Sequence, residues 1–115
     1  MSHLFIGVAF LLWGASVGAM SITGSTAKNA LLTIVGTIDV GDDVALRRRL
    51  GPAVLGRRVR VYIKSDGGDV ATAMKIGRTL REQEASVSTD RCLSSCALVL
   101  IGGVQRDVLD RKSVV

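Results

Sequence analysis

The chain has 115 residues and a formal net charge of +5, with 15 basic against 10 acidic side chains. This length predicts one small domain with a modest core. Two cysteines and a single histidine, His3, are too few ligands for a closed zinc site, so we expect no metal and no other cofactor. Aromatic residues make up only 3% of the chain, so the core must be built from Val, Leu, Ile and Ala, which is typical of parallel sheets covered by helices.

The first hydrophobic segment, residues 4–22, contains no charged side chain and approaches the length of a bilayer-spanning helix. Small residues at positions 17–19 are of the kind that a signal peptidase reads. We therefore expect residues 1–22 to be a signal peptide or a membrane anchor, and the protein to be periplasmic or membrane-anchored. The nearest positive charge, Lys28, follows the segment, which disfavours translocation. A buried N-terminal helix is the alternative.

The small polar residues 23–29 predict a spacer. Residues 30–38 are nearly all apolar, which predicts a strand buried on both faces. The acids of residues 39–43 predict the start of a helix that ends near Gly51-Pro52. Further strands are predicted at residues 59–63 and 85–89, and helices at residues 69–84 and 94–101. This alternation predicts an α/β domain over residues 30–115, a parallel sheet with right-handed crossovers.

The basic residues are concentrated at positions 47–49 and 57–60. A nucleic-acid-binding surface is one interpretation. The arginines lack interleaved aromatic residues, however, and ten acidic residues offset the positive charge. We therefore expect solvated surfaces and no nucleic-acid partner, and keep a basic nucleic-acid binder as the lesser alternative.

Ser65-Asp66-Gly67-Gly68 lies between the second predicted strand and the long helix. Glycine has no Cβ, so the backbone can adopt positive φ and approach a bound group closely. Free amides at the start of the following helix would stabilise a developing oxyanion, as acyl transfer requires. An ordinary tight turn explains the same residues equally well.

The second motif, Cys92-Leu93-Ser94-Ser95-Cys96, precedes the last predicted helix. A serine at such a position has its hydroxyl beside unpaired amides and at the positive end of the helix dipole. Ser94 and Ser95 could instead be ordinary N-caps. The two cysteines are close enough in sequence for a disulfide bracing the turn, and two buried thiols are the equal alternative.

With both motifs in order, the chain from about residue 30 onward resembles the proteolytic subunit of Clp protease and its exported relatives in the Clp/crotonase-like superfamily. The resemblance is carried by residues 34–38, by residues 62–70 around the glycine pair, and by residues 92–103 followed by Arg106. The Cys-x-Ser-x-Cys form resembles the periplasmic branch in particular. The resemblance implies a Clp/crotonase-like fold that is incomplete at its C-terminus.

The same resemblance implies that Ser94 is the nucleophile and that the amides of Gly68 and Ser95 form the oxyanion hole. Gly67 and Asp66 would support the site. Asp66 stands where the family usually has proline, and its charge would oppose an oxyanion if it pointed inward. A peptide or protein would be the substrate, and assembly into homo-oligomers is typical of these relatives.

In such proteins a catalytic histidine follows soon after the arginine that corresponds to Arg106, and an acidic residue comes later. This sequence ends at Val115 without either, so we expect a C-terminally truncated member of the superfamily. A lysine could replace the histidine as base, and the candidates are Lys64, Lys75 and Lys112. Without a base, a serine nucleophile loses several orders of magnitude in rate. We therefore expect weak or no hydrolysis of peptide bonds, and a non-catalytic exported binding or assembly module is the alternative.

Overall fold

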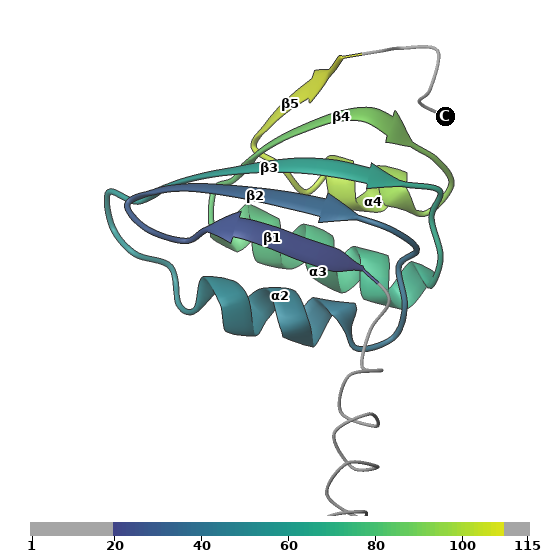
Figure 1. The fold of residues 1–115 in the computed structure, drawn as a ribbon, viewed down its shortest axis with the longest axis horizontal. Coiled ribbons are helices and arrows are strands. Elements are labelled where there is room, and N and C mark those ends of the chain that lie inside the picture. Colours follow the sequence, from purple (N-terminus) through teal and green to yellow (C-terminus); the bar gives the residue numbers. More distant parts are fainter. Residues whose placement is uncertain (1–19, 110–115) are drawn as a thin grey trace, which may run out of the picture.

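The computed structural model describes residues 20–109. They form an α/β fold with one five-stranded sheet in the order β1-β2-β3-β4-β5 (Figure 1). Strand β1 is antiparallel to β2, and the remaining neighbours are parallel. The elements in chain order are β1 (Ser21–Ser25), β2 (Asn29–Val35), α2 (Asp42–Leu50), β3 (Arg58–Ser65), α3 (Val70–Glu82), β4 (Ser86–Cys92), α4 (Cys96–Leu100) and β5 (Gln105–Val108). The predicted α/β architecture is confirmed, but the sheet is mostly and not wholly parallel, because β1 runs antiparallel to β2.

The helices α2, α3 and α4 all lie on one side of the sheet (Figure 1). Burial alternates along β2 and β3 accordingly, with every second side chain packed against the helices. The prediction that residues 30–38 form a strand buried on both faces was wrong. It failed because Leu31 and Val35 are apolar yet 48% and 40% exposed, on the face that no helix covers.

The predicted spacer at residues 23–29 is also corrected, because Ser21–Ser25 forms strand β1. This strand pairs with β2 along its whole length, so the sheet includes residues that were assigned to the N-terminal segment and to the spacer. The Arg49 side chain of α2 donates to the carbonyls of Ile22 and Gly24, at 3.0 and 2.8 Å. An edge strand needs a partner on one side only, so its sequence can be polar.

The core is aliphatic, as the composition predicts. Its largest fully buried side chains include Leu32, Ile34, Ile63, Ile76 and Leu80. Helix α3 packs closely against α4 and the turn after it through glycines. A Cβ on Gly77 would lie 2.6 Å from the carbonyl oxygen of Leu98, and a Cβ on Gly102 would lie 2.3 Å from that of Gly77. These contacts fix α4, and with it the turn that precedes α4.

Within residues 20–109, no helix is long and apolar enough to cross a membrane. The hydrophobic segment of residues 4–22, His3 and Lys112 lie wholly or largely outside the described range.

Candidate functional site

The glycine turn follows the end of β3 and is held by the chain that leaves β2. The amide of Ile38 donates to the carbonyl of Gly67 at 2.9 Å, and the amide of Asp69 donates to the carbonyl of Ile38 at 2.8 Å. Gly67 and Gly68 have φ angles of 104° and 150°, which disfavour any residue with a side chain. A Cβ on Gly68 would also lie 2.1 Å from the carbonyl oxygen of Ile38. The glycine pair is therefore required by the turn itself.

The serine motif packs directly against this turn. A Cβ on Gly67 would lie 2.9 Å from the Cβ of Ser94 and 3.2 Å from the backbone nitrogen of Ser95. The Ser95 hydroxyl accepts a hydrogen bond from the amide of Gly68 at 2.8 Å and donates to the carbonyl of the same residue at 3.0 Å. The structure thus brings together the four residues Gly67, Gly68, Ser94 and Ser95, which come from two separate crossovers.

The two serines differ in what they offer. Ser95 is only 5% exposed, and its hydroxyl is used by Gly68 both as donor and as acceptor. Ser94 is exposed, and its side chain makes no hydrogen bond to any residue in the range 20–109. Its φ angle is 54°, a conformation that costs a residue with a Cβ some strain. Ser94 is therefore the hydroxyl that an incoming ligand would meet.

The backbone amides predicted as an oxyanion hole are not equally available. The amide of Gly68 already donates to the Ser95 hydroxyl. Among the described residues, the amide of Ser95 has no hydrogen-bond acceptor. An oxyanion beside Ser94 would thus find one free donor, and would gain the second only if the Ser95 hydroxyl turned away. This contact was not predicted, although a second hydroxyl residue at a buried helix start could have indicated it.

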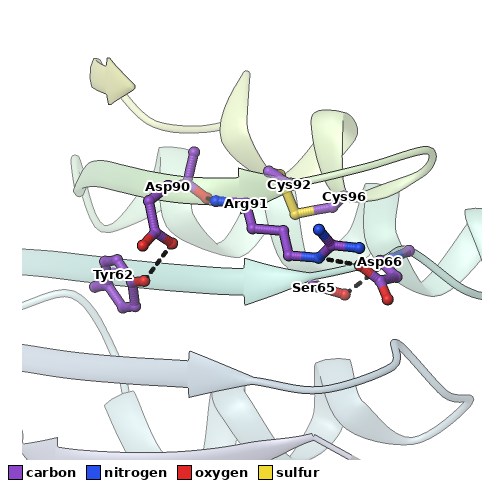
Figure 2. Close-up of polar contacts among 9 residues, drawn as sticks. Tyr62, Ser65, Asp66, Asp90, Arg91, Cys92 and Cys96 are labelled. Atoms are coloured by element: carbon purple, nitrogen blue, oxygen red, sulfur yellow. Dashed lines mark hydrogen bonds and ion pairs between the residues drawn. A yellow bond between two sulfur atoms is a disulfide. The ribbon is translucent and has the colours of Figure 1, made fainter. Parts of the chain in front are cut away.

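Cys92 and Cys96 form a disulfide, which decides between the two alternatives that the sequence left open (Figure 2). Cys92 ends β4 and Cys96 begins α4, and neither residue is exposed. The closed loop contains Ser94, so the bond limits the backbone motion of the strained residue. The same loop is held from its other side by the hydrogen bonds between Ser95 and Gly68.

Asp66 does not act as an unpaired charge at the turn. Its carboxylate accepts a hydrogen bond from Arg91 Nε at 2.7 Å, and both side chains are largely exposed (Figure 2). A register irregularity between Ile63 and Lys64 brings Arg91 of β4 into position beside the end of β3. An exposed ion pair contributes little stability. It nevertheless offsets the negative charge that would oppose an oxyanion.

Two other carboxylates near this end of the sheet have defined partners. Asp69 caps α3 by accepting from the amide and the hydroxyl of Thr72, at 2.9 and 2.6 Å. These bonds hold the pKa of Asp69 below its usual value. The Tyr62 hydroxyl donates to Asp90, and this hydrogen bond, with some burial, raises the pKa of the Tyr62 phenol (Figure 2).

No general base pairs with Ser94 in the part of the chain that the structure describes. Histidine is absent from residues 20–109. Lys64 on β3 and Lys75 on α3 are exposed, and neither makes a hydrogen bond or ion pair with Ser94. The same residues also contain no group of three or more side chains suited to holding a metal ion.

Comparisons with models of known protein families, with curated proteins and with solved structures found no match for this chain. The resemblance to the Clp/crotonase-like superfamily therefore rests on the sequence motifs alone.

Proposed function

We propose that this chain carries the nucleophile half of a serine-peptidase-like site of the Clp/crotonase type, exported or anchored through its N-terminal segment. The observation that carries the proposal is the contact between the glycine turn and an exposed Ser94 at positive φ. The loops of two separate crossovers meet at this contact. An ordinary tight turn or a helix cap would not require the two loops to meet. A peptide carbonyl would be the electrophile, and the protein would act on peptides or proteins, alone or as a homo-oligomer.

The chemistry follows from the groups around Ser94. Its Oγ would attack the carbonyl carbon, and the carbonyl oxygen would take up the negative charge and accept from the Ser95 amide. The serine proton needs an acceptor, and the described residues offer none beside Ser94. We therefore propose that this chain hydrolyses peptide bonds weakly or not at all.

A second candidate function, a non-catalytic peptide-binding or assembly module, is favoured by one specific contact. The Ser95 hydroxyl occupies the Gly68 amide that catalysis would need. If this contact is permanent, the exposed Ser94 and the turn would serve recognition and not acyl transfer.

Labelling with a fluorophosphonate probe separates the two functions. We expect slow labelling of the full chain, located at Ser94 by mass spectrometry and abolished in Ser94→Ala. Ser88→Ala, which removes a hydroxyl from β4 of the sheet, is the control and should leave the labelling rate unchanged. Ser95→Ala retains the backbone amide and frees that of Gly68, so its labelling should be faster by about tenfold or more.

Absence of labelling in both the wild type and Ser95→Ala would favour the binding module. Fast labelling of the wild type would instead contradict the proposal that a base is missing.

A further inference from the structure

The face of the sheet that no helix covers carries a broad open groove of about 1090 Å³ near the start of β3. Arg58 and Arg60 line it from β3, Ser86 from β4 and Gln105 from β5. We call these four residues the arginine groove. It lies near the amino ends of the parallel strands, whereas the glycine turn and Ser94 follow their carboxyl ends.

The sheet register explains why these groups converge. Arg60 is aligned with Ser86, and Ser86 with Gln105, so the three form one row across β3, β4 and β5. Arg58 lies two residues before Arg60, so its side chain points to the same face. The Ser86 hydroxyl and the Gln105 side-chain oxygen are 3.3 Å apart. This contact leaves the Gln105 amide nitrogen free to donate.

Arg58 and Arg60 have no hydrogen-bond or ion-pair partner within residues 20–109, whereas Arg57, which also borders the groove, is held by Gln83. Hydrogen bonds or ion pairs hold Arg47, Arg49, Arg57, Arg81 and Arg91. None is found for Arg58 or Arg60, nor for Arg48 and Arg78, which lie on helices on the other side of the sheet, or for Arg106. Arginines without partners around one concave surface create a positive potential that attracts a negatively charged ligand.

We propose that the arginine groove binds an acidic peptide segment in extended conformation. Arg58 and Arg60 lie two residues apart on β3, which separates them by about 7 Å along the strand. Carboxylates at every second residue of an extended peptide have the same spacing, so two guanidinium–carboxylate pairs form in register. Guanidinium and carboxylate also match in geometry, which gives paired hydrogen bonds.

A nucleic acid fits the groove less well. Its lining contains no aromatic side chain on which a base could stack. Glu84 and Asp107 also line it, and they would repel a continuous phosphate backbone. An extended peptide can place neutral residues next to these two acids and its carboxylates next to the arginines.

The test uses the full chain in a mild nonionic detergent and a fluorescein-labelled octapeptide of alternating Glu and Thr, followed by fluorescence anisotropy. The variant Arg58→Gln/Arg60→Gln removes two charges from the groove. The matched control, Arg48→Gln/Arg78→Gln, removes two exposed charges from helices α2 and α3 on the other side of the sheet. We expect the groove variant to bind about tenfold more weakly and the control to change affinity by less than about twofold.

Two comparisons test the spacing and the class of ligand. An octapeptide with four consecutive Glu followed by four Thr has the same charge, and we expect it to bind several-fold more weakly. Single-stranded DNA of equal charge should compete poorly. Equal losses in both double variants, tighter binding of the DNA, or no peptide binding would each overturn the proposal.

A second measurement covers the case in which the groove variant does not fold. In amide NMR spectra of the unmodified chain, the alternating peptide should shift the signals of Ser86 and Gln105 and leave those of α2 in place. Shifts confined to the helices would refute the assignment. The site is independent of Ser94, so this experiment and the probe labelling can fail separately.

Discussion

Replacing Gly68 by alanine tests the central geometric claim, that the glycine turn is locked between Ile38 and the serine loop. The new Cβ would lie 2.1 Å from the carbonyl oxygen of Ile38 and 2.8 Å from its nitrogen. Both are backbone atoms, so no side-chain rotation can relieve the contact. The chain around Ile38 must move away, or the turn must open.

The expected cost has two parts. Moving Ile38 away breaks its hydrogen bonds to Gly67 and Asp69, each worth about 0.5–1.5 kcal/mol. Placing an alanine at the φ of 150° adds about 1–3 kcal/mol of backbone strain. Together these lower the free energy of unfolding by about 2–6 kcal/mol, a large fraction of the 5–15 kcal/mol typical of a domain.

Gly56→Ala is the matched control. Gly56 also has a positive φ, 84°, but a Cβ there would meet no atom within 4 Å. Its cost is therefore conformational alone, about 1–2 kcal/mol. Urea unfolding followed by far-UV circular dichroism should show a clearly larger loss for Gly68→Ala. If the two variants lose the same stability, the close contact with Ile38 does not exist as described and the proposed site loses its framework.

Two further predictions concern the same end of the sheet. The disulfide closes a five-residue loop, which reduction with a dithiol or the double variant Cys92→Ala/Cys96→Ala would open. Either change should lower the free energy of unfolding by about 2 kcal/mol. An unchanged urea midpoint, after mass spectrometry has verified reduction, would contradict this. Tyr62 is the single tyrosine of the chain, so its absorbance at 295 nm reports one phenol. The midpoint of this titration should lie above the ordinary value of 10.0 and return toward it in Asp90→Ala, which removes the hydrogen bond and the negative charge. The raised pKa means that the folded state holds the phenol proton more tightly than the unfolded state does. The free energy of unfolding should therefore fall as the pH rises above 10.0. A titration midpoint that Asp90→Ala leaves unchanged would refute the assigned cause.

The proposed function and the proposed peptide groove occupy different ends of the sheet. The glycine turn and the serine loop follow the carboxyl ends of β3 and β4, where the ends of parallel strands usually gather functional groups. The arginine groove lies toward the amino ends of the same strands. Each site is tested by variants that leave the residues of the other site unchanged.

The sequence by itself determined the local structure well. Apolar periodicity predicted the helix that the structure places at Val70–Glu82, and β-branched runs predicted the strands that became β2, β3 and β4. It also singled out the two motifs, because glycine pairs and helix-start serines are unusual locally. The two edge strands, β1 and β5, were missed, since an edge strand takes its stability from its partner and needs no apolar pattern of its own.

Only the tertiary structure decided which groups meet. The Ser95 hydroxyl reaches Gly68 across 27 residues of chain, and Asp66 reaches Arg91 across 25, so no local pattern specifies either contact. The disulfide required the 5.2 Å separation between the Cα atoms of Cys92 and Cys96, which the turn between β4 and α4 sets. Residue type and spacing fix what each segment can form alone, whereas the pairing of hydroxyls, amides and charges depends on packing that brings distant segments together.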